Sequence, residues 1–109
     1  MDRGRAVEII RSYITSRAYD FLKALDRACR NYYAKDCPAL FVDEPEKFRD
    51  ILLRYNDEST TKFVVKSLFL KPLLDELGKT VLADELAEAF VRDPAEFRKR
   101  LASLLGLPS

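Results

Sequence analysis

The sequence contains no histidine, and this absence removes the side chain most often used for chemistry at neutral pH. Histidine is the usual general base of enzymes and the commonest protein ligand of zinc. The di-iron sites of helical bundles also require a Glu-x-x-His element. Glu85 and Glu88 lie three residues apart, but without that element they indicate a solvated helix face and not a metal site.

Motifs that mark an active site or a bound cofactor are also missing. None of the three glycines belongs to a phosphate-binding loop or to a G-x-S-x-G nucleophile elbow. No EF-hand pattern occurs, and two cysteines are too few for a structural zinc site without help from carboxylates. The sequence therefore predicts a protein that is not an enzyme, with no catalytic residues, cofactor or metal, although Asp, Lys and Tyr can act as acids and bases.

Long apolar runs are absent too. No run approaches the ~20 residues that a membrane-spanning helix needs. The first residues, Met1 to Arg5, lack the apolar stretch of a secretion signal. The net charge of +1 argues against strong binding of polyanions by bulk charge. We therefore expect a soluble cytoplasmic protein with no membrane partner.

Glutamine and tryptophan are absent and only two asparagines occur, whereas Arg, Lys, Glu and Asp are plentiful. Few thermolabile amides together with many charges resemble the composition of thermophile proteins. Intracellular disulfides do occur in hyperthermophiles, so Cys29 and Cys37 are candidates for a disulfide if the chain turns back after residue 33. The alternative is that Cys29 is simply a small core residue bordering an apolar stripe.

What the chain has in abundance is apolar residues at helical spacing. Apolar residues make up 48% of the chain and charged residues 34%, which is typical of a single folded domain over residues 1–109. Helices are expected over residues 7–33, 45–55, 61–77, 81–91 and 94–105. Residues 31–44 are expected to be a connector, because Pro38 excludes a continuous helix. We predict an all-α fold, a compact bundle of four to five helices.

One phrase, F-V-x-x-P-x-x-F-R-x-x-L, begins at Phe41 and again at Phe90. Proline suits the first position of a helix, and an acidic residue before it can cap the free N–H groups, so each copy predicts a helix start. Two interpretations stay open. The phrase is either a common helix opening that arose twice by chance, or the product of a duplicated helix–loop–helix unit, with pseudo-repeated halves at 11–57 and 60–106.

The segment 61–77 is the most apolar of the chain, and its apolar residues spread around the whole helical wheel. A helix that is apolar on all sides is buried inside a bundle or at a subunit contact. The sequence therefore predicts a non-catalytic helical interaction module, self-associating as a homo-oligomer or docking on a protein partner. The candidate interface residues are Phe63, Val64, Leu68, Leu70 and Leu74.

The alternative function is a small nucleic-acid-binding protein that uses the basic face of the first helix. Cations interleaved with aromatic rings are typical of proteins that bind single-stranded nucleic acid. On one helical wheel, four cations of the first helix share a face opposite the apolar stripe, and further basic and aromatic residues follow. The candidate contacts are Arg5, Lys23, Arg27, Arg30, Tyr33 and Lys35.

Charge is unevenly distributed along the chain. Residues 1–35 carry eight basic and four acidic side chains, a net charge of +4, whereas residues 36–60 carry three basic and seven acidic ones, a net charge of −4. The two blocks either pair with each other, within one chain or between subunits, or form two solvated faces.

Overall fold

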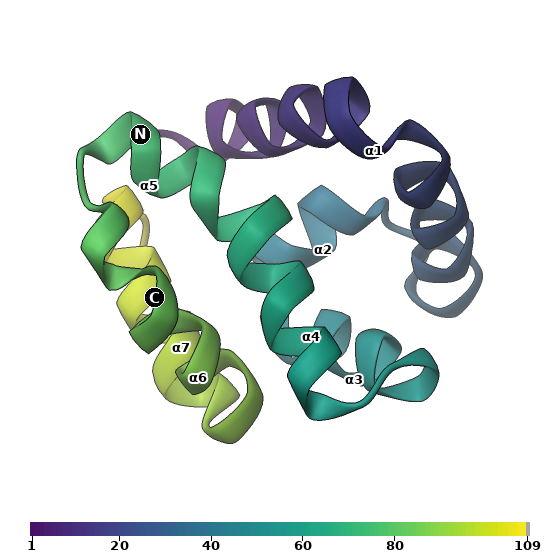
Figure 1. Ribbon diagram of the computed structural model, residues 1–109. Coiled ribbons are helices and arrows are strands. Elements are labelled where there is room, and N and C mark those ends of the chain that lie inside the picture. Colours follow the sequence, from purple (N-terminus) through teal and green to yellow (C-terminus); the bar gives the residue numbers. More distant parts are fainter. Residues whose placement is uncertain (109) are drawn as a thin grey trace.

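The structure, a computed structural model that describes residues 1–108, begins with a long helix that bends once (Figure 1). Helix α1 spans Arg3–Tyr33, and the Asp2 carboxylate caps it by accepting a hydrogen bond from a backbone N–H of the first turn. At Ala18 the backbone leaves helical geometry (φ −149°, ψ 54°). We call residues 19–33, which follow this bend, the second half of α1. Ala34, in the left-handed conformation, ends the helix.

Two short helices follow and meet at a single residue. Helix α2 spans Cys37–Asp43 and helix α3 spans Pro45–Tyr55, with Glu44 between them. The prediction of a connector over residues 31–44 was therefore wrong for α2. Asp36 caps this helix, and a proline is tolerated in its first turn because N–H groups there have no helical partner.

Residues 58–77 form one helical rod with a widened turn in its middle. Helix α4 spans Glu58–Val64, a π-helical turn covers Val65–Leu70, and helix α5 spans Lys71–Leu77. Pro72 accounts for the wide turn, because its ring has no N–H to donate and would clash with the carbonyl four residues earlier in a regular helix. The predicted helix over 61–77 is thus present, with a π-turn where the proline perturbs it.

A second pair of short helices completes the chain. After a 3₁₀ turn at Thr80–Leu82, helix α6 spans Ala83–Arg92 and helix α7 spans Pro94–Leu105. Asp93 alone joins them, and its carboxylate caps α7 by accepting a hydrogen bond from a backbone N–H. Gly106 adopts a positive φ of 71° and ends α7, as a glycine after the last helical residue predicts.

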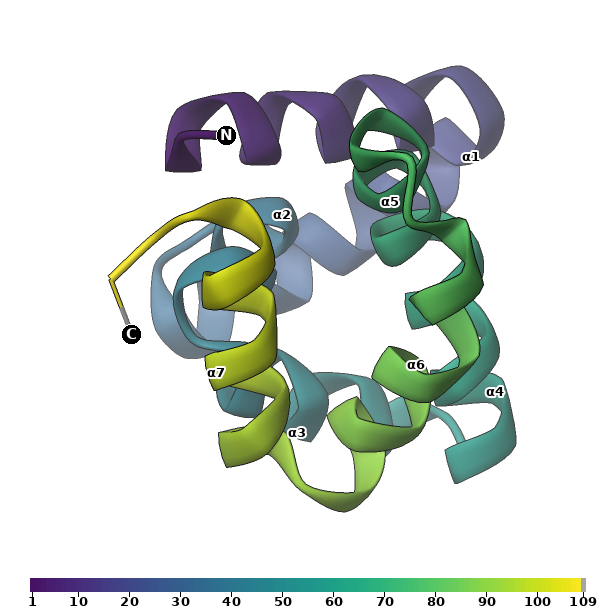
Figure 2. The same ribbon diagram turned by 90° about the vertical axis from the view of Figure 1, so that its left-hand side faces the viewer.

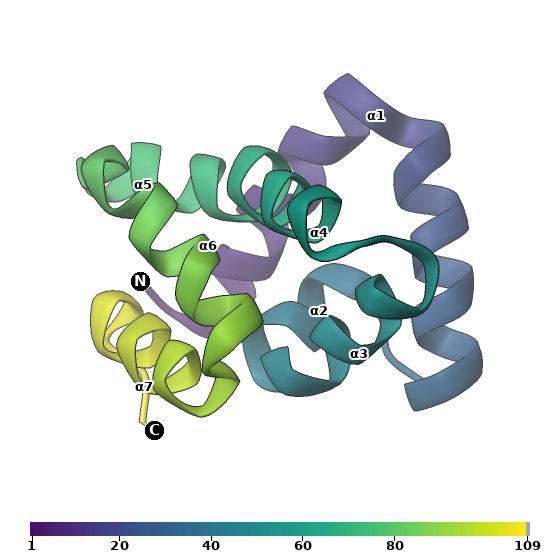
Figure 3. The same cartoon turned by 60° about the horizontal axis from the view of Figure 1, so that its bottom comes forward.

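All regular structure within residues 1–108 is helical, which confirms the predicted all-α class. With residues 58–77 counted as one rod, this part of the chain forms six rods instead of four to five, and the additional one is α2. The rods run in several directions and do not form one bundle of parallel helices (Figures 1 and 3). In the described part of the chain, no helix combines the length and the apolar character needed to cross a membrane.

Five phenylalanines form the centre of the core. Phe41, Phe48, Phe69, Phe90 and Phe97 are each 0% exposed. The Phe41 ring centroid lies 5.2 to 6.0 Å from the centroids of the other four rings, in tilted or edge-on arrangements that aromatic pairs favour. Four of the five belong to the repeated phrase, so this phrase supplies the middle of the core as well as two helix starts.

In both copies of the phrase, the joint between two helices has the same backbone conformation. The joint residues have nearly equal backbone angles, φ −140° and ψ 68° at Glu44 and φ −147° and ψ 75° at Asp93. The units pack on each other, with α3 against α7 (Figure 2). Each unit contributes one arginine to their contact.

These arginines make reciprocal contacts. Arg49 Nε of the first unit donates to the Val91 carbonyl at 2.8 Å, and Arg98 Nη1 of the second unit donates to Glu46 Oε1 at 2.6 Å. Arg49 thereby gives a hydrogen-bond donor to a backbone carbonyl near the end of α6, where carbonyls have no N–H partner within the helix. The contacts fix the two helix pairs relative to each other.

The rod 58–77 is covered by other helices of the same chain. Val64, Leu70 and Leu74 are buried, Leu68 is half-buried, and only Phe63 is largely exposed, at 68%. The prediction of a subunit interface on these five residues is therefore corrected for Val64, Leu70 and Leu74, because these three lie in the core. The reason is that α1, α3 and α6 pack around the rod and cover most of its apolar surface.

The positive and negative blocks of the sequence pair within the chain. Arg3 Nε lies 2.6 Å from Asp43 Oδ1, Lys35 Nζ lies 3.2 Å from Asp43 Oδ2, and Arg11 Nη2 lies 3.4 Å from Asp36 Oδ1. The hydrogen bond from Arg3 is the main reason that the pKa of Asp43 is lowered. The pairs of Arg3 and Arg11 join α1 to the two ends of α2, and the pair of Lys35 joins the turn before α2 to its last residue.

Candidate interaction groove

An apolar groove of about 390 Å³ separates the second half of α1 from the end of α3. Its wall on α1 is formed by residues at helical spacing and its opposite wall by the last residues of α3 and the turn after it. The lining residues are Phe21, Ala24, Leu25, Arg27, Ala28, Asn31, Tyr55 and Asn56. Most of these side chains are apolar or small, with two amides and one guanidinium as the polar groups.

The bend in α1 gives this groove its position. The first half of α1 lies along the rod 58–77, whereas the second half turns away and runs beside α2 (Figures 1 and 3). One side of the second half is covered by α2, and the residues facing α3 are only partly covered. Phe21 is 37% exposed and Tyr55 is 63% exposed. Large apolar side chains that remain exposed together mark a surface suited to binding.

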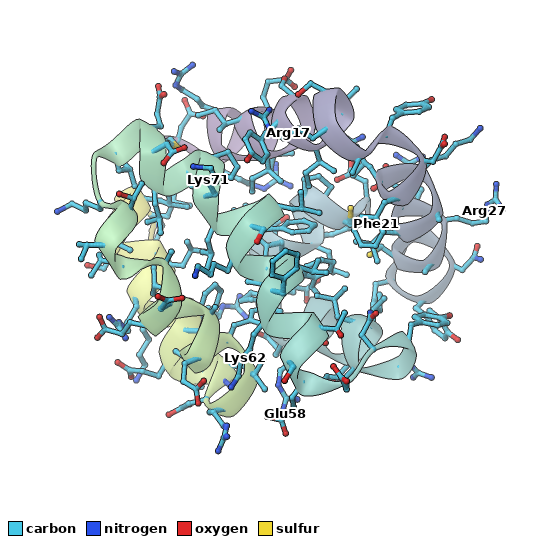
Figure 4. The ribbon with its side chains drawn as sticks, in the orientation of Figure 1. Arg17, Phe21, Arg27, Glu58, Lys62 and Lys71 are labelled. Carbon is cyan, nitrogen blue, oxygen red and sulfur yellow. The ribbon has the colours of Figure 1, made fainter. Side chains whose placement is uncertain are left out.

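The second half of α1 has a different outer face. Phe21 points inward toward the body of the molecule, while Arg27 extends outward from the same helix (Figure 4). Lys23, Arg27 and Arg30 follow one another at spacings of four and three residues and line a shallow surface depression together with Asp26 and Asn31. We call these three cations the basic ridge. Arg27 also contributes to the groove lining, so the ridge runs along the groove's rim.

One aromatic–cation pair lies beside the groove, and a second lies on α1 before the bend. The Arg54 guanidinium stacks over the Tyr32 ring at 4.6 Å from its centroid, and the Arg17 guanidinium over the Tyr13 ring at 4.0 Å. The Tyr32 hydroxyl interacts with that of Tyr55 and raises the pKa of Tyr55 above its ordinary value. The Arg54–Tyr32 stack joins the end of α3 to the end of α1.

Several cations around the groove have no carboxylate partner. Within residues 1–108, Lys23, Arg27 and Arg54 take part in no ion pair. Arg30 reaches Asp36 only at 3.9 Å, near the limit of an ion pair. The rim of the groove is therefore positively charged, which favours a ligand with carboxylates or phosphates.

The predicted nucleic-acid contacts are not all on this surface. Three of the six predicted contacts, Lys23, Arg27 and Arg30, form the basic ridge. Arg5 lies before the bend, apart from the ridge, and pairs with Glu76 at 2.6 Å. Lys35 is engaged by Asp43, and Tyr33 is half-buried with a lysine over its ring. The single basic face drawn on a straight helical wheel is therefore corrected to a shorter ridge on the second half of α1.

Of the residues that line the groove, the sequence indicated only Arg27 as a candidate binding residue. Helical spacing assigned Phe21 to the buried stripe of α1, and Tyr55 continued the apolar spacing of α3. Spacing shows which side of a helix is apolar, but it does not show whether another helix covers that side. Arg54 was missed because its partner ring, Tyr32, lies on a different helix.

The polar groups that line the groove are those of Arg27, Asn31, Tyr55 and Asn56. In the part of the chain that the structure describes, no cluster of three or more His, Cys, Asp or Glu side chains could hold a metal ion. Comparisons with protein-family models, with curated proteins and with solved structures find no match to this chain.

Proposed function

We propose that this protein is a non-catalytic helical interaction module that binds an amphipathic helix of a partner protein. The binding site is the groove between the second half of α1 and the end of α3. The observation that carries this proposal is the groove itself, with the exposed rings of Phe21 and Tyr55 on its two walls. Helices that insert apolar side chains into such grooves are a recurring mode of recognition.

The charge of the rim indicates which helix the groove prefers. Lys23, Arg27 and Arg54 take part in no ion pair within residues 1–108, so they are free to pair with carboxylates of a partner. A partner helix with apolar residues at i, i+3, i+4 and i+7 and with Glu or Asp on its flanks satisfies both features. The partner is therefore an acidic amphipathic helix.

A titration of the ¹⁵N-labelled full chain tests this proposal. The probe is a synthetic helical peptide with leucines at the four anchor positions and glutamates on the flanks, and the matched control peptide has lysines in place of the glutamates. We expect saturable chemical-shift changes at the groove residues with the acidic peptide. Phe21→Ala is expected to weaken binding about 10-fold, because most of an aromatic side chain is lost from the contact.

Val81→Ala serves as the matched control variant. Val81 is 89% exposed in the turn between α5 and α6, away from the groove, so its truncation should leave peptide binding unchanged. Equal binding of the acidic and basic peptides, or shift changes outside the groove only, would contradict the proposed site. If light scattering of the free chain shows a dimer that Phe21→Ala dissociates, the occupant of the groove is a second copy.

A second candidate function rests on the basic ridge. Lys23, Arg27 and Arg30 lie along one edge, with the Arg54–Tyr32 stack nearby, and such interleaving suits single-stranded nucleic acid. If the ridge makes three phosphate contacts, the affinity for oligothymidylate falls as the salt concentration rises. A plot of the logarithm of the affinity against the logarithm of the salt concentration then has a slope of about −2.

Fluorescence anisotropy with labelled oligothymidylate measures this slope. Replacing both Arg27 and Arg30 by alanine should nearly abolish binding. The matched control removes two exposed cations elsewhere, Lys79 and Lys99, and should have little effect. Binding that both double variants reduce equally would reflect general charge attraction and would eliminate the ridge as a site.

We also infer that the halves 11–57 and 60–106 derive from one duplicated unit. What supports this is that each half contains a long interrupted helix followed by two short helices. The joints at Glu44 and Asp93 also share one backbone conformation, and Phe41 and Phe90, which begin the two copies, have ring centroids 6.0 Å apart in the core. Duplication explains the architecture and is independent of the binding function.

A further inference from the structure

Two cysteines lie together in the corner where α1 ends and α2 begins. Cys29 and Cys37 are both 0% exposed, and both are free thiols. Both belong to the buried core where α1 packs on α2, and the neighbouring Cys29 side chain contributes to raising the pKa of Cys37. The turn at Ala34, in the left-handed conformation, brings the chain back, so the condition that the sequence sets for a disulfide between them is met.

The surroundings of the pair hold both cysteines in place. Cys37 is the first residue of α2, and its backbone N–H donates to Asp26 Oδ1 at 2.9 Å. Arg11 donates to the same carboxylate at 3.2 Å to Oδ2, and it also approaches Asp36, the cap of α2. Cys29 belongs to the buried side of α1. The corner is therefore held by both helices and by a network of charged hydrogen bonds, with the two thiols next to each other.

We propose that Cys29 and Cys37 form a redox-controlled staple. Oxidation by a small-molecule disulfide, or by the disulfide of an oxidoreductase, converts them into an intrachain disulfide that fastens the second half of α1 to α2. This inference rests on the placement of the two thiols and does not depend on the proposed function. The staple nevertheless acts on the groove, because it restrains the helix that forms one of its walls.

The chemistry is a pair of thiol–disulfide exchange steps. The thiolate of one cysteine attacks a sulfur of the oxidant, so that a mixed disulfide forms and one thiol of the oxidant leaves. The second cysteine, after losing its proton, attacks the protein sulfur of the mixed disulfide and releases the other thiol of the oxidant. The protein loses two electrons and two protons, and the oxidant is reduced to two thiols.

The burial of the pair sets the conditions for this reaction. Burial, together with the neighbouring Cys29 thiol and the Asp26 carboxylate, raises the pKa of Cys37 above its ordinary value. Because both cysteines are 0% exposed, the folded corner also keeps the oxidant away from both sulfurs. Oxidation therefore occurs during folding, or when the corner opens, and moderate denaturant accelerates it. Once formed, the buried disulfide is protected in the same way.

The test uses the full-length chain, reduced with dithiothreitol and then incubated with oxidised glutathione in moderate denaturant. After refolding we expect a monomer that is two hydrogen masses lighter and has no thiol that reacts with a thiol reagent in strong denaturant. Its Tm should exceed that of the reduced chain by roughly 10 °C, because the unfolded chain is constrained. A reducing agent should reverse both changes.

The single variants Cys29→Ser and Cys37→Ser are the matched controls. Each retains one thiol, so neither can lose the two hydrogens, and the Tm of neither should gain the increase seen after oxidation of the native chain. Three results would overturn the staple: two free thiols after incubation in denaturant, disulfides only between chains, or an oxidised monomer that melts no higher than the reduced one.

Discussion

Replacement of Phe41 by alanine is expected to lower the free energy of unfolding by about 4 kcal/mol, the largest loss from any single side chain considered. Phe41 is fully buried, and its ring contacts four other phenylalanines that come from four different helices. A cavity at this point cannot be filled without moving both helix pairs. Since a domain of this size is stable by roughly 5–15 kcal/mol, the variant would retain only part of its stability.

Urea unfolding followed by circular dichroism measures this loss. Phe63→Ala is the matched control, because it removes the same side chain from a position that is 68% exposed, and we expect a change within about 0.5 kcal/mol. If the two variants lost equal stability, the phenylalanine cluster would not be the centre of the core. A loss at Phe41 below about 1 kcal/mol would lead to the same conclusion.

Asp26→Ala is expected to lower the free energy of unfolding by about 3 kcal/mol. The Asp26 side chain is 14% exposed, and it accepts hydrogen bonds from the Cys37 backbone N–H and from the Arg11 guanidinium. Its removal leaves a part-buried N–H at the start of α2 without a partner and weakens the hold on a part-buried cation. Both consequences fall on the corner that joins α1 to α2.

Asp26→Asn separates these two contributions. An asparagine keeps a carbonyl oxygen for the Cys37 N–H but removes the charge that pairs with Arg11, so we expect about half of the loss. Equal losses for the two variants would mean that the hydrogen bond to α2 contributes little. Asp20→Ala is the control, since Asp20 is exposed on the same helix and its loss should change stability by less than about 0.5 kcal/mol. A loss below about 1 kcal/mol for Asp26→Ala would contradict the proposed role of the corner.

The helix ends show how far local signals reach. The sequence predicts helix starts at Pro45 and Pro94 and helix ends at Gly78 and Gly106, and the structure confirms all four. Capping and the fixed φ of proline act within a few residues, so they operate whatever the rest of the chain does. The helix α2 was missed although Asp36 and Pro38 are a cap and a first-turn proline, because Pro38 was interpreted only as a helix breaker.

The bend at Ala18 has no comparable signal. Neither a proline nor a glycine is near it, and alanine favours a continuous helix. The bend lets the first half of α1 pack on the rod 58–77 while the second half packs beside α2. This arrangement of distant segments leaves Phe21 at the groove and separates Arg5 from the basic ridge, so neither feature of the candidate site could be predicted from residue spacing.

The sequence by itself determined that the chain is helical, where most of its helices start and stop, and which side of each helix is apolar, because these properties depend on neighbouring residues. Only the tertiary structure decided which apolar sides are covered. The rod 58–77 is buried by helices of its own chain, while the groove beside the second half of α1 stays open. Coverage depends on the directions in which six rods cross, and those directions follow from the bend, the two one-residue joints and the packing of the phenylalanines.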